Sequence, residues 1–225
     1  MARFVLVPGA GGVAWYWHRV VPLLADAKHH AIAVDLPGDD EQAGLAAYAD
    51  RVVEAIGSHD DAILVAQSLG GFTAPLVCER VRVRRVVLVN AMIPLRGETA
   101  GEWWENTGSI GARTAAARRG GYREDFDLAT YFFHDVSPEI IEQGAAHQRP
   151  EADIVFGDAC RFEAWPEVPI HVIAGRDDRF FPLDFQRRVA RERLGSTVDE
   201  VAGGHLVALS NPHGLASQLL TYLRA

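Results

Sequence analysis

The fold is decided by the stretch Ala62-Ile63-Leu64-Val65-Ala66-Gln67-Ser68-Leu69-Gly70-Gly71. Its apolar first half predicts a buried strand, and the residues that follow, up to Arg80, have helical character. Ser68 therefore stands at a sharp turn from strand to helix, where the small residues Ala66 and Gly70 let the two elements approach closely. Such a turn lifts a serine hydroxyl out of the sheet, whereas a serine near two glycines in an ordinary loop would have no such role.

Two later segments place an acid and a histidine after predicted strands. Asp178 follows the apolar run at residues 170–174, and His205 follows a weaker predicted strand at residues 198–201. The chain order is therefore Ser68, Asp178, His205, which is typical of α/β-hydrolases. A serine hydroxyl becomes a good nucleophile when an imidazole takes its proton and a carboxylate orients that imidazole. The three residues together predict a catalytic triad.

A glycine-rich loop follows the first predicted strand, at residues 4–7. In an α/β-hydrolase this loop offers one backbone N–H to the oxyanion that forms during acyl transfer, and the residue after the nucleophile offers the other. The two donors would be Ala10 and Leu69. They predict an oxyanion hole beside Ser68.

A dinucleotide-binding loop is the alternative interpretation of the same glycines. Two of them fit the G-x-G-x-x-G fingerprint, and Asp35 lies about where a ribose-binding acid is expected. The last glycine of the fingerprint is Ala14, however. This alternative also leaves the serine, aspartate and histidine without a role.

The chain resembles the α/β-hydrolase superfamily, and most closely its small branch of plant methylesterases and hydroxynitrile lyases with their bacterial relatives. The resemblance covers most of residues 3–91 and 169–225. It implies an α/β-hydrolase core that needs no cofactor and no metal. The matching stretches are Phe4-Val5-Leu6-Val7-Pro8-Gly9-Ala10, Trp15-Tyr16-Trp17, Asp35-Leu36-Pro37-Gly38, Gln67-Ser68-Leu69-Gly70-Gly71, Gly175-Arg176-Asp177-Asp178 with Pro182, and Gly204-His205.

The family pattern also bears on the acid and on the limits of the resemblance. Its spacing Gly-x-x-Asp-x-x-x-Pro favours Asp178 over Asp177, which would then be a turn residue. Two positions depart from the family. Pro8 stands where a histidine is usual, and Gln67 replaces the histidine or glutamate that usually precedes the nucleophile. Neither lies in the triad, so the mechanism carries over but a particular substrate does not.

Continuous apolar runs alternate with helical patterns along much of the chain, which predicts a doubly wound α/β sheet. We expect about six strands, mostly or wholly parallel, whose carboxyl ends share the edge where ligands bind. One helix is predicted over residues 45–56 and ends at Gly57. The expected strands lie near residues 4–7, 31–34, 62–66, 86–89, 170–174 and 198–201.

The alternation stops between residues 92 and 167, where only short helical fragments are expected, at residues 114–119 and 138–148. In the family an insertion at this point, after the fourth predicted strand, forms a cap over the active site. The resemblance thus divides a single catalytic domain into a core, residues 1–91 and 168–225, and a cap. Half of the aromatic residues lie in the cap, so we expect an apolar pocket. The candidate substrate-binding residues are Trp103, Trp104, Phe132, Phe133 and His134.

Composition narrows the class of protein. The chain has 225 residues, 48% of them apolar, and no apolar run approaches the 18 residues typical of a membrane span. A net charge of −8 argues against nucleic acid as a partner. Cys78 and Cys160 lie far apart and suggest neither a disulfide framework nor a metal site. We expect a cytoplasmic monomer or homodimer without a leader sequence or a membrane partner, acting on a small-molecule ester.

The residues predict a serine hydrolase that cleaves a small or medium, largely apolar ester through an acyl-enzyme. One alternative is a lyase that cleaves cyanohydrins. In that branch a lysine follows the catalytic histidine and a threonine lies in the oxyanion loop, but this chain has Leu206 and Ala10 there. The other alternative is a non-catalytic ligand-binding module on the same fold.

Overall fold

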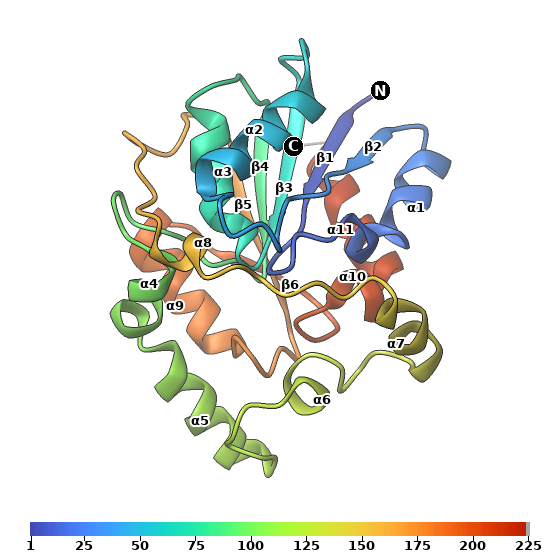
Figure 1. Ribbon diagram of the computed structural model, residues 1–225. Helices are drawn as coiled ribbons and strands as arrows, with labels where there is room; N and C mark the ends of the chain where they lie inside the picture. The colour runs from blue at the N-terminus through green and yellow to red at the C-terminus, as the bar shows by residue number, and fades with distance from the viewer. Residues whose placement is uncertain (224–225) are drawn as a thin grey trace.

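All six strands of the sheet run parallel, in the order β2-β1-β3-β4-β5-β6. This computed structural model describes residues 1–223 and confirms the expected α/β-hydrolase fold. The sheet is drawn in Figure 1. Its strands are β1 (Arg3–Val7), β2 (His30–Ala33), β3 (Ala62–Gln67), β4 (Arg85–Val89), β5 (Ile170–Gly175) and β6 (Val198–Val201).

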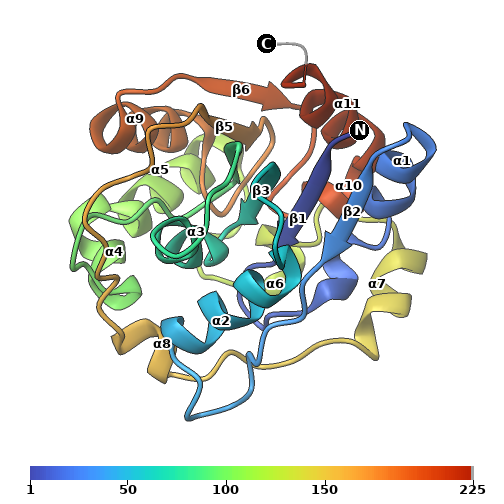
Figure 2. The same ribbon diagram turned by 90° about the horizontal axis from the view of Figure 1, so that it is seen from above.

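Helices cover both faces of the sheet, and so the central strands are buried throughout and apolar except for Gln67 and Arg85 at their ends. Every residue of β3 and β4 is buried, as expected for parallel strands that pack on both sides. Figure 2 looks down on these layers. One face packs against α2 (Leu45–Ile56), α3 (Gly70–Cys78) and α9 (Leu183–Leu194). The other packs against α1 (Val20–Asp26) and α11 (Pro212–Thr221).

Local sequence explains where several of these helices begin and end. The helix predicted over residues 45–56 is α2, and it stops at Gly57, whose φ of 63° suits glycine. The helical end of the chain is divided into α10 (Val207–Ser210) and α11 because Pro212 lacks the amide that would continue the first helix. Asn211 instead caps α11 by accepting from the amide of Gly214. The aromatic segment near Tyr16 forms a 3-10 turn, η1 (Ala14–Trp17).

Between β4 and β5 the chain leaves the sheet for a long helical excursion. Figure 1 shows α5, α6 and α7 beyond the carboxyl ends of the strands. The excursion contains α4 (Ala100–Thr107), α5 (Ser109–Gly120), α6 (Leu128–Tyr131), α7 (Pro138–Ala145) and α8 (Ile154–Gly157). The two expected fragments correspond to α5 and α7, whereas α4 was not expected. Its signal is the capping box in which Thr99 and Glu102 bond each other's backbone amides.

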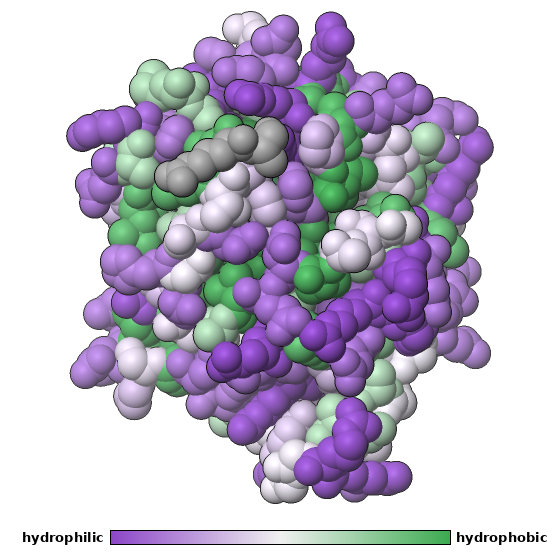
Figure 3. Space-filling view, turned by 180° about the vertical axis from the view of Figure 1, so that it is seen from behind, coloured by the Kyte–Doolittle hydropathy of each residue, from purple (hydrophilic) through white to green (hydrophobic). Residues whose placement is uncertain are grey.

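The surface is mixed in character. The face seen in Figure 3 carries mostly polar side chains, with apolar residues visible between them. Across residues 1–223, no helix is both long enough and apolar enough to cross a lipid bilayer.

Candidate active site

Ser68 lies at the tight turn between β3 and α3. Its φ is 50°, a left-handed conformation that is uncommon for a residue with a side chain. The end of β4 and the loop after it hold this turn, because the Ser68 amide donates to Val89 O and the Met92 amide donates to Ser68 O. A Cβ on Gly9 would lie 2.8 Å from the Cβ of Ser68, so only glycine permits this approach of the loop that follows β1, residues 9–12 (the β1 loop).

His205 connects the serine to a carboxylate. Its Nε2 lies 3.1 Å from Oγ of Ser68, and its Nδ1 lies 2.9 Å from Oδ2 of Asp178. His205 is 1% exposed. A histidine bonded in this way can take a proton from the serine while its ring is held by the acid.

The carboxylate of Asp178 is fully enclosed by donors. Besides His205, it accepts from the amides of Phe180 and Phe181, at 2.8 and 2.9 Å, and from Gln186 at 3.3 Å. The neighbouring Asp177 does not contact His205 and has other partners. It binds Arg176 and accepts from the Gly203 amide. The contact with Arg176, reinforced by that amide, holds the pKa of Asp177 below its usual range.

Asn90 is a buried residue of this site that the sequence patterns did not single out. It follows β4, has a φ of 45° and is fully buried. Its amide nitrogen donates to the carbonyls of Gly204 and His205, and its oxygen accepts from the Gly175 amide. Asn90 thereby holds the ends of two strands together beneath the histidine. The signal in the sequence is a polar residue directly after a buried strand.

Ala10 stands in the loop after β1, and Leu69 directly follows the serine at the start of α3. Within residues 1–223, neither backbone N–H donates to a protein acceptor. The loop and the turn touch, because a Cβ on Gly70 would lie 2.6 Å from Pro8 O. These are the properties that two oxyanion donors require, and that role remains a prediction.

A cavity of about 300 Å³ lies beside the histidine and the β1 loop. Leu206, which directly follows His205, lines it, and so does Ala10 of the β1 loop. Phe132 lines it as well, and its ring lies 4.8 Å from the ring of His205. The other apolar and aromatic residues of its wall are Val13, Trp15, Tyr16, Leu128, Phe133, Val136, Ile140, Ile141 and Leu209, and Gly144, His147, Gln148 and Arg149 complete it.

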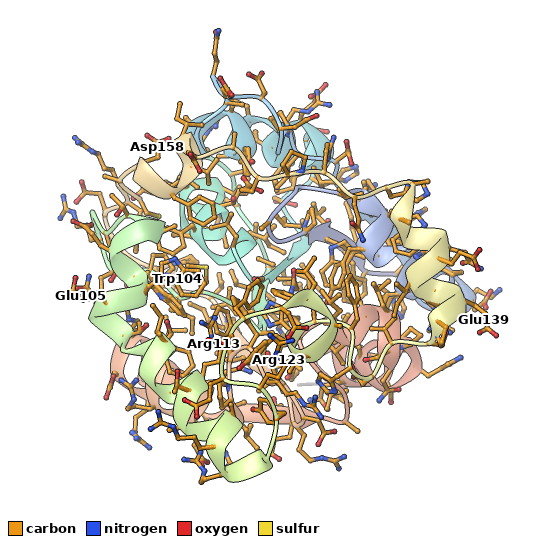
Figure 4. The ribbon with its side chains drawn as sticks, turned by 60° about the horizontal axis from the view of Figure 1, so that its bottom comes forward. Trp104, Glu105, Arg113, Arg123, Glu139 and Asp158 are labelled. Atoms are coloured by element: carbon orange, nitrogen blue, oxygen red, sulfur yellow. The ribbon has the colours of Figure 1, made fainter. Side chains whose placement is uncertain are left out.

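Of the five expected substrate-binding residues, two line this cavity and three do not. Phe132 and Phe133 line it. Trp103 is fully buried, and its indole donates to Ile93 O, so it belongs to the core. Trp104 packs on other aromatic rings, and Figure 4 shows it directed from α4 toward the interior. His134 faces a separate open cleft with Asp135 and Asp177, and burial lowers its pKa.

Aromatic rings also surround the histidine on the side of the acid. The ring centres of Phe180 and Phe181 lie 5.0 and 5.1 Å from that of His205. Arg113 reaches from α5 toward this cluster, with its guanidinium carbon 5.5 Å from the ring centre of Phe180 (Figure 4). The rings of Phe180 and Phe181 meet the imidazole edge-on and keep water away from the His205–Asp178 bond, which strengthens that bond electrostatically.

Asp35, the acid of the dinucleotide alternative, is engaged by the protein itself. It forms an ion pair with Arg149 at 3.1 Å and accepts from the Ala14 amide at 3.0 Å. Its carboxylate thus organises the β1 loop rather than facing an open ribose site. Among the described residues, no group of three or more His, Cys, Asp or Glu side chains is arranged to hold a metal ion. Cys78 and Cys160 are both free.

Comparisons with known proteins bear on the sequence and the fold. A model of the alpha/beta hydrolase family matches residues 4–218. The chain is 34% identical over 250 residues to a probable esterase, PIR7A, from Oryza sativa subsp. indica, which covers 97% of this chain and 95% of that protein. It is 25% identical over 248 residues to an alpha-hydroxynitrile lyase from Arabidopsis thaliana, covering 96% and 95%. The crystal structure of polyneuridine aldehyde esterase has a TM-score of 0.82 at 21% identity, over 99% of both chains, and shares the fold.

Proposed function

The chain belongs to the alpha/beta hydrolase family, and we propose that it is a serine esterase acting on a small or medium, largely apolar ester. The observation that carries the proposal is the position of His205, within 3.1 Å of the Ser68 hydroxyl and 2.9 Å of the Asp178 carboxylate. The esterase name of the relative from rice, at 34% identity, supports the same reaction class.

The reaction begins when Oγ of Ser68 attacks the ester carbonyl carbon and Nε2 of His205 takes the hydroxyl proton. Asp178 orients the ring and stabilises the imidazolium that forms. The carbonyl oxygen becomes an oxyanion, which accepts hydrogen bonds from the amides of Ala10 and Leu69. The imidazolium then protonates the departing alkoxide, the alcohol leaves, and the acyl group stays on Ser68.

Water then hydrolyses the acyl-enzyme, and His205 again acts first as the base and then as the acid. His205 takes a proton from the water, the hydroxide attacks the acyl carbon, and the second tetrahedral intermediate collapses. The acid leaves, and the proton on His205 returns to Ser68. No electron transfer occurs, and every proton is accounted for by the one histidine.

The cavity supports an apolar substrate. Its volume of about 300 Å³ is at the lower end of the range for small-molecule sites, and its wall is mainly aliphatic and aromatic. The residues of 92–167 supply much of that wall, including Phe132 and Ile140. We infer that this segment acts as the cap that shields the ester from water.

A cyanohydrin lyase is the second candidate, because an alpha-hydroxynitrile lyase is among the relatives. The resemblance gives that branch a lysine directly after the catalytic histidine. This chain has Leu206 there, on the wall of the cavity, and its sole lysine is Lys28. Lys28 is exposed and lies between α1 and β2, at the opposite edge of the sheet from Ser68. The esterase is therefore favoured.

A chromogenic ester and a fluorophosphonate test the proposal together. The wild-type protein is expected to release p-nitrophenol from a short-chain ester and to be labelled covalently once per chain. Ser68→Ala should lose both properties. Turnover without labelling, or labelling that survives the Ser68→Ala substitution, would contradict a Ser68 esterase. Cyanide release from a cyanohydrin, with no ester turnover, would instead support the lyase.

A further inference from the structure

The β1 loop, residues 9–12, is held by two charged side chains from a distant part of the chain. Arg149 and Glu151 lie between α7 and α8 in sequence, in a stretch that no motif identified. We propose that both are positioning residues, which fix the peptide planes of this loop so that the Ala10 amide faces the oxyanion. The proposal rests on the proposed esterase function.

Arg149 binds the loop through its carbonyl oxygens. Its guanidinium donates to Gly11 O and Gly12 O, both at 3.0 Å, and to Leu36 O at 2.9 Å. The ion pair with Asp35 orients the guanidinium from its other side. One planar group therefore joins the β1 loop to the loop after β2. A planar fork of five donors suits this task better than the single ammonium of lysine.

Glu151 binds the same loop through an amide. Its carboxylate accepts from the Gly11 N–H and from the hydroxyl of Tyr48, a buried residue of α2. Burial raises the pKa of Glu151, although the bonds from Tyr48 and Gly11 oppose this effect. The carboxylate is thus tied to the scaffold at one oxygen and to the loop at the other.

Contacts within the protein occupy the amides of Gly11 and Gly12 and leave the Ala10 amide for a ligand. The Gly11 N–H is taken by Glu151, and the Gly12 N–H donates to Gly9 O at 3.0 Å. Among residues 10 to 12, all of which the structure describes, only the Ala10 N–H has no protein acceptor. Gly11 and Gly12 have φ values of 84° and 66°. Glycines rotate freely, so the loop needs external bonds to keep the Ala10 amide in place.

Close backbone packing also holds the β1 loop in place. A Cβ on Gly11 would lie 2.7 Å from the carbonyl oxygen of Arg149, and one on Gly38 would lie 2.4 Å from Gly11 O. The amide of Ala152 donates to Gly38 O at 2.7 Å. The backbone of the segment that contains Arg149 and Glu151 therefore packs directly against the backbone of the β1 loop.

If Arg149 and Glu151 serve only the stability of the fold, replacing them should lower stability alone. If they position the Ala10 amide, replacing them should selectively weaken binding of the transition state. The test compares Arg149→Ala, Arg149→Lys, Glu151→Ala and Glu151→Gln with Arg96→Ala, which breaks an exposed ion pair with Glu163. The measurements are kcat and KM on a p-nitrophenyl ester, the melting temperature, and the inhibition constant of a trifluoromethyl ketone. The hemiketal oxyanion of that inhibitor occupies the oxyanion hole.

We expect Arg149→Ala and Glu151→Ala to lower kcat by roughly 10- to 100-fold, less than the loss of a whole oxyanion donor, with KM changed by less than about threefold. The ketone should weaken by a similar factor. Glu151→Gln should keep most activity, since its amide oxygen still accepts from Gly11. Arg149→Lys should be intermediate, and Arg96→Ala should match the wild type.

Two failures are distinguishable. If Ser68→Ala is inactive while both alanine variants keep wild-type kcat and ketone affinity, the positioning role is overturned and the esterase stands. The positioning role is equally overturned if the alanine variants lose only melting temperature. If Ser68→Ala retains full turnover, the esterase itself is wrong, and the positioning role falls with it.

Discussion

Oδ2 of Asp178 lies 2.9 Å from Nδ1 of His205, and both side chains are shut off from solvent. The adjacent Asp177 has no such contact; it binds Arg176 and the Gly203 amide near the surface. The two neighbours therefore differ in what they can do for the histidine, although their chemistry is the same.

The first prediction separates these aspartates. Asp178→Asn should lower kcat by about 10⁴-fold, because the amide favours the wrong histidine tautomer while the geometry is kept. Asp177→Asn should retain most activity and lose at most about 1–2 kcal/mol of unfolding free energy. Steady-state kinetics and thermal unfolding of both variants check this. Exchanged phenotypes would make Asp177 the acid.

The second prediction concerns the nucleophile. Ser68→Ala should lower kcat by roughly 10⁴- to 10⁶-fold and leave only the catalysis of the oxyanion hole and binding. Mass spectrometry of the fluorophosphonate adduct should locate it on Ser68. An adduct at any other residue, with Ser68 unmodified, would assign the chemistry elsewhere.

The third prediction concerns the cavity. Ile140→Ala shortens a side chain of its wall, away from the triad. The rate constant kcat/KM for a hexanoate ester should fall by roughly 10- to 100-fold, while that for acetate should stay within about threefold, since each well-packed methylene contributes about 1–3 kcal/mol. Ile110→Ala, the same change at an exposed residue outside the cavity, is the control. Equal losses on both esters, or a preference for dianionic esters, would contradict an apolar substrate pocket.

The fourth prediction concerns stability against acid. Glu98 and Arg193 form a buried ion pair. Burial alone would raise the pKa of Glu98, but the bonds from Arg193, Asn106 and the Leu95 amide outweigh it and hold the pKa below its usual 4.5. Because the folded pKa is the lower one, the stabilisation is fully present above about pH 4.5 and is lost as pH falls below it.

Urea unfolding between pH 7 and pH 3 measures this effect. The wild-type free energy of unfolding should fall steeply below pH 4.5, and Glu98→Gln should show a shallower slope there. At pH 7, Glu98→Ala should cost about 3–5 kcal/mol, since it leaves Arg193 buried without its partner. Parallel pH profiles for the wild type and Glu98→Gln would exclude Glu98 as the titrating group.

The sheet and the placement of the triad residues could be predicted because their signals are local. A strand buried on both faces is a continuous apolar run, and Ser68 and Asp178 each follow one, whereas His205 follows the weaker strand at residues 198–201, which contains two acidic residues. Parallel strands bring these carboxyl ends to one edge without any knowledge of side-chain contacts. The distances of 3.1 and 2.9 Å required the structure.

The surroundings of the triad could not be predicted, because they depend on contacts between remote segments. Arg149 and Gly11 are 138 positions apart, and neither has a periodic pattern that would pair them. Aromatic composition was equally uninformative about location. Trp103 and Phe133 both lie in an aromatic-rich segment, yet the first fills the core and the second lines the cavity.

The excursion after β4 returns to β5, the neighbouring strand in the sheet. Its length therefore does not affect the pairing of the strands. A chimera that carries the corresponding segment of a relative would therefore exchange much of the cavity wall in one step. The position of the junction decides whether such a graft works. Asp135 accepts from the Gly204 amide, and Arg149 and Glu151 hold the β1 loop. A breakpoint between residues 145 and 148 keeps Arg149 and Glu151 with their own loop, and the donor then has to bring equivalents of Asp135 and of Glu98, the buried partner of Arg193.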